Sequence, residues 1–347
     1  MRPGEELDLA AVEGWLRQRL PGLAGAAEVT QYAGGASNWT YRLRYPQAQP
    51  PLDLVLRRPP AGTKAKSAHD MGREFRIQQA LGPVFPYVPR MIGLCEDPAL
   101  LGASFYVMER IPGAIARRRL PEGCEWTPES ARSLCLGVVD RLVELHGVDV
   151  GAAGLAGLGK GPGYPRRQIE GWSQRYQQAR TWNVPRFHRV CDWLHARIPE
   201  DAGRCVIHND YRLDNLVLAE DEPTRIVGVL DWEMATVGDP LMDLGAALAY
   251  WVQADDDPVA RRFRRQPTHL PGMLTRREVV ERYLAATGRA AVDWPFYEVY
   301  GLFRIAVIAQ QIYYRYHHRQ TRNPAFRSFW LLVHYFHWRC RRLMGRA

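Results

Sequence analysis

Several features of secreted, membrane and zinc-binding proteins are missing from this 347-residue chain. Its six cysteines form no C-x-x-C pair and show no zinc-ligand spacing, so we expect reduced thiols. No apolar run approaches the length of a membrane-spanning helix. The amino-terminal segment carries Glu5, Glu6 and Asp8 where a signal peptide would have a basic start and an apolar core. These absences predict a cytoplasmic protein without a membrane partner.

The chain also lacks an internal repeat, and its length exceeds that of one ordinary domain. A hydrophobic content of 46% is enough to bury a sizeable core in two lobes. The amino-terminal part is rich in strand patterns, whereas helix-like stretches dominate the remainder. We therefore expect an α+β protein with a small β-rich lobe over 1–110 and a larger, mostly helical lobe over 111–347.

The most informative motif reads HNDYRLDN over residues 208–215, and Asp231 follows it after two short apolar runs. Phosphoryl transfer requires positioning groups and cations around a nucleoside triphosphate and an acceptor hydroxyl. Asp210 could accept or orient the acceptor proton, while Asn215 and Asp231 offer the oxygen ligands that Mg²⁺ prefers. The spacing predicts a kinase.

The two apolar runs, 216–218 and 226–230, are separated by a polar, turn-prone stretch. Such a pattern is typical of an antiparallel hairpin, which brings the start of its first strand and the end of its second to one end. We therefore expect Asn215 and Asp231 to lie near each other. Two other interpretations are a capped turn with His208 as a core histidine, and a phosphohydrolase metal site using His208, Asp210 and Asp231.

The motif resembles the H-x-D-x-x-x-x-N catalytic loop of aminoglycoside phosphotransferases and related small-molecule kinases, and VLDWEMATVGDPLMDLG (229–245) resembles their metal-binding segment. The ordered motifs GGASNWTY, VLRRPP, REFRIQQAL, FYVMERIPG and GDPLMDLG favour the branch related to the kinase-like domain of certain acyl-CoA dehydrogenases. This resemblance implies a protein-kinase-like fold, ATP or GTP as cosubstrate, and Mg²⁺. Asp210 and His208 would then belong to the catalytic loop, with Asn215 and Asp231 on the metal.

The nucleotide-binding residues follow partly from physics and partly from this resemblance. Backbone N–H groups of the turn at Gly34 and Gly35, with Ser37 and Asn38 beside it, could approach phosphates closely, although the G-x-G-x-x-G pattern is absent. By resemblance, Met108, Glu109 and Ile111 would lie along the adenine, where backbone groups make the contacts.

Arginine replaces the lysine that kinases usually place in the third strand. Arg57 shares a strand face with Val55 and could bind phosphate and carboxylate together. Its expected partner is Glu74, which lies in the amphipathic segment 72–81. A solvated glutamate is the alternative.

A second acidic pair lies within the segment 229–245, after Asp231. Asp239 precedes Pro240 in a helix-start signature, which predicts a capping role. Asp243, in the first turn, would brace the catalytic loop by resemblance.

The uneven distribution of charge along the chain indicates the chemical class of the acceptor molecule. Residues 258–347 contain 17 arginines, no lysine and four acids, which gives +13 and leaves −4 for the rest of the +9 chain. A basic region would attract an anionic acceptor, such as a hydroxy acid or a hydroxyacyl-CoA, rather than a polycationic aminoglycoside. These arginines could also be a solvated surface.

Three alternatives remain open at this point: an aminoglycoside, amino-alcohol or sugar kinase, a protein kinase, and a non-catalytic binder of nucleotide or nucleic acid. The protein kinase would need an A-P-E motif and a long activation segment, both absent after Asp231. We expect a small-molecule acceptor and no nucleic-acid partner.

Overall fold

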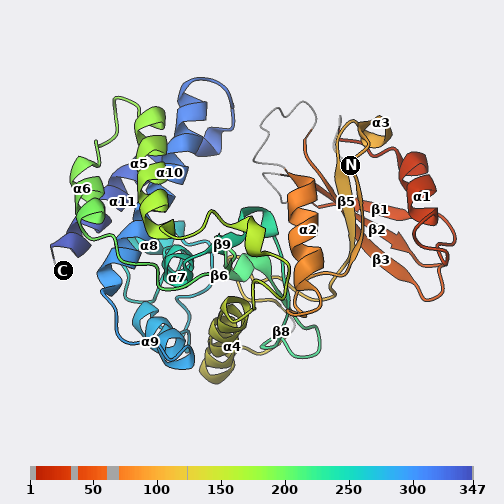
Figure 1. Ribbon diagram of the computed structural model, residues 1–347, viewed down its shortest axis with the longest axis horizontal. Helices are drawn as coiled ribbons and strands as arrows, with labels where there is room; N and C mark the ends of the chain where they lie inside the picture. Colours follow the sequence, from red (N-terminus) through yellow and green to blue (C-terminus); the bar gives the residue numbers. More distant parts are fainter. Residues whose placement is uncertain (1–4, 33–37, 61–69, 123, 346–347) are drawn as a thin grey trace. The chain divides into compact units, whose positions relative to one another are not determined.

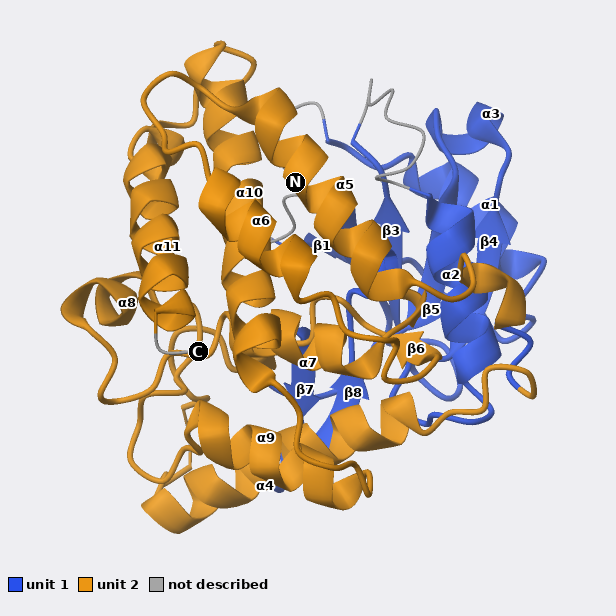
Figure 2. Ribbon diagram, turned by 60° about the vertical axis from the view of Figure 1, so that its left-hand side comes forward, with its two compact units in different colours: residues 1–115, 153–155, 215–235 blue, residues 116–152, 156–214, 236–347 orange. Residues whose placement is uncertain are grey.

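A computed structural model describes residues 5–32, 38–60, 70–122 and 124–345. The chain folds into two compact units, which Figure 2 distinguishes by colour. Unit 1 consists of residues 1–115, 153–155 and 215–235, and unit 2 of residues 116–152, 156–214 and 236–347. The expected lobe boundary between residues 110 and 111 stays a prediction.

In unit 1, five strands of the described residues form an antiparallel sheet. Their spatial order is β1 (Glu28–Gln31), β2 (Trp39–Tyr45), β3 (Leu52–Arg58), β5 (Phe105–Glu109) and β4 (Met91–Cys95). Helix α1 (Leu9–Arg17) packs with Leu54 and Leu56 on one face. Helix α2 (Met71–Leu81) packs with Val55 on the other (Figure 1). The alternation of buried side chains along β3 therefore directs neighbouring residues to opposite helices.

Unit 1 also contains the hairpin of β7 (Leu216–Leu218) and β8 (Ile226–Val229). The short helix α3 (Pro98–Leu101) precedes β5, and a single 3-10 turn, Trp232–Met234, follows the hairpin. The buried Trp232 ring contacts Phe85 edge-on, with 6.0 Å between the ring centroids. This aromatic contact ties the segment after the hairpin to the loop that follows α2.

Unit 2 is mainly helical. Its described elements include two short paired strands, β6 (Cys205–Ile207) and β9 (Thr236–Gly238), and the helices α4 (Pro128–His146), α5 (Tyr164–Ala179), α6 (His188–Ala196), α7 (Pro240–Leu248), α8 (Pro258–Phe263), α9 (Arg276–Ala286), α10 (Trp294–His317) and α11 (Phe329–Met344). Short 3-10 turns lie at Ala156–Leu158 and Pro324–Phe326, and the turn Leu213–Asn215 ends at the first residue of the unit 1 segment 215–235.

Helix α10 runs through the core of this unit. Most of its side chains are buried, and it packs on α7 through a pair of glycines. A Cβ at Gly301 would lie 2.3 Å from the carbonyl oxygen of Gly245, so only glycine allows the two backbones to approach this closely. Within the described ranges, no helix combines the length and apolarity needed to cross a bilayer.

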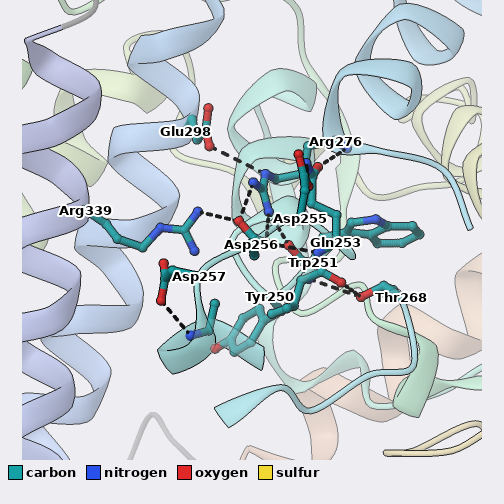
Figure 3. A network of polar contacts seen from close by, with 12 residues as sticks. Tyr250, Trp251, Gln253, Asp255, Asp256, Asp257, Thr268, Arg276, Glu298 and Arg339 are labelled. Carbon is teal, nitrogen blue, oxygen red and sulfur yellow. Dashed lines mark hydrogen bonds and ion pairs between the residues drawn. The ribbon is translucent and has the colours of Figure 1, made fainter. Parts of the chain in front are cut away.

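The carboxylate of Asp256, whose side chain is 7% exposed, joins three parts of unit 2 (Figure 3). It accepts from both terminal nitrogens of Arg276, at 2.6 and 2.9 Å, and from the backbone N–H of Gln253. Arg339 of α11 adds a contact at 3.4 Å. Arg276 begins α9, so one carboxylate fixes α9 and α11 to the segment that follows α7. Two of the carboxy-terminal arginines are therefore structural.

Candidate active site

The hairpin of unit 1 brings two candidate metal ligands together. Leu216 pairs with Val229, and the N–H of Leu230 donates to the carbonyl of Asn215 at 2.8 Å. Asn215 thus lies beside the residue that precedes Asp231, which confirms the predicted hairpin geometry. Asp231 itself has a φ of +67°, in the left-handed region that a non-glycine residue seldom adopts. Such conformations concentrate at functional sites.

Arg57 links the sheet to this hairpin. Its guanidinium donates to the buried Glu74 carboxylate and, at 3.1 Å, to Oδ1 of Asp231. The same guanidinium also donates to the hydroxyl oxygen of Tyr106 at 3.3 Å. The side chain of Glu74 is only 1% exposed, so the alternative of a solvated glutamate is wrong and the expected Arg57–Glu74 pair is confirmed.

The pair carries opposite charges in a buried place. Burial alone would lower the pKa of Arg57, but the Glu74 carboxylate beside it raises that pKa well above its usual value. Burial raises the pKa of Glu74, an effect that the Arg57 guanidinium opposes. Because arginine stays protonated, the guanidinium keeps its charge next to Asp231. A fixed cation beside a proposed metal ligand suits the binding of phosphate oxygens.

Helix α2 holds the segment after Asp231 as well. Arg73 donates to the carbonyl of Glu233 at 3.1 Å and to the carbonyl of Ala235. The buried side-chain amide of Asn38 donates to a carboxylate oxygen of Glu233 at 3.3 Å. Asn38 is therefore tied to the proposed metal segment. Gly34, Gly35 and Ser37, the other expected residues of the phosphate turn, lie outside the described residues.

The expected adenine-contacting residues end strand β5. Met108 is buried in the cluster between the sheet and α2. Glu109 is the last strand residue; its N–H donates to the carbonyl of Arg90 at 2.8 Å, and its carboxylate pairs with the Arg90 guanidinium. The side chain of Ile111 packs over Gly228 of β8, where a Cβ would lie 2.6 Å from Ile111 Cδ1. The connector is thereby anchored to the hairpin, while its role toward adenine stays a prediction.

The catalytic-loop candidates belong to unit 2, where Asp243 holds the loop. This fully buried carboxylate accepts from the backbone N–H groups of His208, at 2.8 Å, and Asn209, at 2.7 Å. Nε2 of His146 lies 3.1 Å from the same carboxylate. Burial alone would raise the pKa of Asp243, but His146 and the His208 N–H hold it below its usual range. The expected bracing role of Asp243 is confirmed.

Asn209 is fixed from two further directions. Its φ is +64°, and its side-chain oxygen accepts from the Tyr164 hydroxyl at 3.2 Å. Its carbonyl accepts from Arg304, a 3% exposed arginine of α10, at 2.6 Å. A buried guanidinium is costly unless it is paired. Burial alone would lower the pKa of Arg304, but Tyr300, followed by Tyr250 and Asp210, raises it above its usual value.

Asp210 follows this fixed peptide. Its N–H donates to Nδ1 of His208 at 3.2 Å, and its carboxylate pairs with Arg212 at 3.1 Å. Arg212 also pairs with Asp214 at 3.3 Å and lies over the Tyr250 ring, 4.7 Å from its centroid. The side chain of Asp210 is 20% exposed, so it remains reachable from solvent. His208 is fully buried and orients the loop from inside.

Sequence reasoning missed several of these partners. Arg304, Tyr164 and His146 were not among the candidates, although each supports the loop that contains Asp210. One signal was available for Arg304, since a single arginine inside the apolar stretch LFRIAV (302–307) requires a partner if the helix is buried. Tyr164 and His146 carry no comparable signal, because their partners come from distant parts of the chain.

The Arg57–Glu74 pair yields a stability prediction. Glu74→Ala should destabilise unit 1 by about 3–5 kcal/mol, because it leaves a buried guanidinium with Asp231 as its remaining carboxylate partner. Arg57→Met should do the same, and the double variant should lose much less than the sum of both. Urea denaturation of the wild type and the three variants measures these losses of unfolding free energy.

The exposed pair of Arg76 and Glu96 on the same unit is the matched control. Glu96→Ala should change the unfolding midpoint very little, since solvent screens that pair. If the double variant lost as much free energy of unfolding as the two single variants together, the proposed coupling between Arg57 and Glu74 would be contradicted.

Comparisons with known proteins agree with this arrangement. The model of the phosphotransferase enzyme family matches residues 28–279. Acyl-CoA dehydrogenase family member 10 of Mus musculus is 35% identical over 314 residues, which cover 88% of this chain. The chain spans only 29% of the length of that protein.

Solved structures show the same fold. A crystal structure of a putative aminoglycoside phosphotransferase from Ralstonia eutropha superposes with a TM-score of 0.83 and 30% identity, and the match covers 99% of both chains. The GDP complex of aminoglycoside 2'-phosphotransferase-IIIa superposes with a TM-score of 0.60 at 15% identity, over 96% of this chain and 99% of that one. The predicted α+β, two-lobed, protein-kinase-like fold is confirmed.

Proposed function

This chain belongs to the phosphotransferase enzyme family, and from that premise we propose that it transfers the γ-phosphoryl group of ATP or GTP, with Mg²⁺, to a hydroxyl of an anionic small molecule. A hydroxyacyl-CoA or a hydroxy acid is the preferred acceptor. The observation that carries the proposal is the pair of salt bridges that Arg57 makes to Glu74 and to Asp231. It supplies a permanent cation for phosphate beside a carboxylate suited to a metal.

The oxygen donors of Asn215 and Asp231 fit Mg²⁺. This ion prefers oxygen ligands and keeps waters and substrate phosphates in its coordination shell, so two protein side chains suffice. The side chain of Asp231 is 34% exposed, which leaves room for such ligands. When bound, Mg²⁺ would neutralise charge on the β- and γ-phosphates. Arg57 would hold the phosphates in the place of the usual lysine.

Asp210 would orient the acceptor hydroxyl and receive its proton. The acceptor oxygen forms a bond to the γ-phosphorus, the bond from that phosphorus to the bridging oxygen breaks, and a nucleoside diphosphate leaves. His208 and Asp243 support Asp210 by holding the loop from inside. Met108, Glu109 and Ile111 would lie along the adenine, and the turn containing Gly34, Gly35, Ser37 and Asn38 would cover the phosphates.

The acceptor class rests on charge. The basic excess of residues 258–347 favours an acceptor with negative charge. The mouse relative is named as an acyl-CoA dehydrogenase family member, and that name supports a thioester of coenzyme A as one such acceptor. An aminoglycoside or another amino-alcohol is the second candidate, because the Ralstonia structure is described as a putative aminoglycoside phosphotransferase.

A screen of nucleotide consumption tests the acceptor class. The purified chain is incubated with Mg²⁺, ATP or GTP, and hydroxyacyl-CoAs, hydroxy acids, choline-like compounds, sugars or aminoglycosides. We expect turnover with hydroxyacyl-CoAs or hydroxy acids, and a new phosphate ester in the ³¹P spectrum. The matched acyl-CoA without a hydroxyl should give only background hydrolysis. Turnover with aminoglycosides alone would contradict the charge argument.

A further inference from the structure

Unit 2 contains a basic pocket away from the catalytic loop. Its volume is about 470 Å³, and its lining residues come from two helices. Helix α5 contributes Arg175, Gln178 and Ala179, and helix α10 contributes Gln311, Tyr314 and Arg315. The lining thus offers two guanidinium groups, two amides and a phenol, and it contains no carboxylate. Such a set of donors suits an anion with several oxygen atoms.

Several arginines of unit 2 are paired with carboxylates. Arg276 and Arg339 share Asp256, and Arg282 binds Asp140. In the part of the chain that the structure describes, neither Arg175 nor Arg315 lies within ion-pair distance of a carboxylate. Arg175 is instead stacked on the Trp172 ring, 4.6 Å from its centroid. Both charges therefore remain available to a ligand.

The two helices connect this pocket to the catalytic loop. They lie side by side in Figures 1 and 2, and Gln310 of α10 donates to the carbonyl of Ala179 at 2.7 Å. Near the other end of α5, Tyr164 binds the side chain of Asn209, whose carbonyl is bound by Arg304 of α10. The contacts follow the same order along both helices, so α5 and α10 run in the same direction.

The spacing along the helices sets a distance. Arg175 follows Tyr164 by eleven positions, and Arg315 follows Arg304 by the same number. At 1.5 Å per residue Arg315 lies about 16 Å along α10 from Arg304, which holds Asn209. Arg175 is nearer, because its guanidinium and that of Arg304 lie 4.6 and 5.4 Å from the centroid of the same Trp172 ring. An acceptor that reaches both places must be extended, with its hydroxyl at one end and its charge at the other.

We propose that this pocket binds the phosphate-bearing nucleotide end of the acceptor, as in a thioester of coenzyme A, while the pantetheine arm extends along α5 and α10 toward Asp210. The inference rests on the proposed function, and it adds the site that recognises the acceptor. Arg175 and Arg315 form charge-assisted hydrogen bonds to phosphate oxygens, and the amides of Gln178 and Gln311 add further donors. These residues determine specificity and take no part in the transfer itself.

Binding of free coenzyme A tests the site without any turnover. Titration calorimetry on the full chain compares the wild type with the double variant Arg175→Gln/Arg315→Gln. We expect the Kd for coenzyme A to rise at least ten-fold, because two charge-assisted contacts are lost. Pantetheine, which lacks the phosphates, should bind equally to both proteins. The control Arg322→Gln/Arg327→Gln removes the same charge from exposed positions of the same unit and should leave the Kd within two-fold.

The outcomes separate the site from the reaction. An unchanged Kd in the pocket variant, or an equal rise in the control, overturns the site. If the Kd responds as expected but no CoA thioester is phosphorylated, the site stands and the proposed acceptor fails. If a hydroxyacyl-CoA is phosphorylated with the same KM in the wild type and the pocket variant, the reaction stands and the site fails. A KM rise much larger than any change in kcat supports both.

Discussion

Asp210→Ala is expected to lower the rate of phosphoryl transfer by about 10³-fold, within the range for loss of a positioned acid or base. Nucleotide should still bind, because the proposed phosphate and metal groups, Arg57, Asn215 and Asp231, are untouched. Single-turnover kinetics with the acceptor found by screening measures the first effect. Fluorescence titration with an ATP analogue and Mg²⁺ measures the second.

The structure offers a matched comparison for this variant. Asp221 is an exposed carboxylate that pairs with Arg225, as Asp210 pairs with Arg212. Asp221→Ala should leave both rate and binding unchanged, since its ion pair is solvated. Equal melting temperatures would exclude unfolding as the cause of the lost rate. Normal turnover by Asp210→Ala would refute the assigned role.

The second large effect concerns Asp243. Asp243→Ala should reduce the free energy of unfolding by about 3–5 kcal/mol, because two buried N–H groups and His146 lose a charged acceptor. Asp243→Asn should also be destabilised, since a neutral amide oxygen is a weaker acceptor than a carboxylate. Chemical denaturation followed by tryptophan fluorescence measures both. Asp140→Ala, which breaks a more exposed pair with Arg282, should cost far less.

The same residue gives a pH dependence with a defined sign. The folded-state pKa of Asp243 lies below its usual value, and unfolded aspartate titrates near ~3.9. The contribution of the Asp243 carboxylate to the free energy of unfolding is therefore complete above about pH 4 and is lost as the pH falls through the folded-state pKa. The stability difference between the wild type and Asp243→Ala should shrink over that acidic range. A difference that stays constant there would contradict the depressed pKa.

Local patterns predicted part of this site well. Two apolar runs around a polar turn were enough to predict the hairpin at Asn215 and Asp231, because strand pairing follows from short-range pattern. Strand parity was enough to direct Arg57 inward, where Glu74 meets it. Asp239 accepts from the N–H groups of Leu241 and Met242, so its expected capping role is confirmed as well.

The loop supports could not be predicted in the same way. Arg304 is 95 positions from Asn209, and His146 is 97 positions from Asp243. Such contacts depend on how the helices of unit 2 pack, and periodicity alone does not determine which helix faces which loop. The roles of Gly34, Gly35 and Ser37 stay predictions for a different reason, because these residues lie outside the described part of the chain.

The left-handed peptide at Asn209 has one more consequence. Three separate helices hold it, through Tyr164, Asp243 and Arg304. The loop is therefore preorganised, so an arriving acceptor need not use binding energy to order it. Under the proposed function, substitutions in the pocket formed by α5 and α10 would therefore change which acceptor binds, while the peptide that positions Asp210 would keep its geometry.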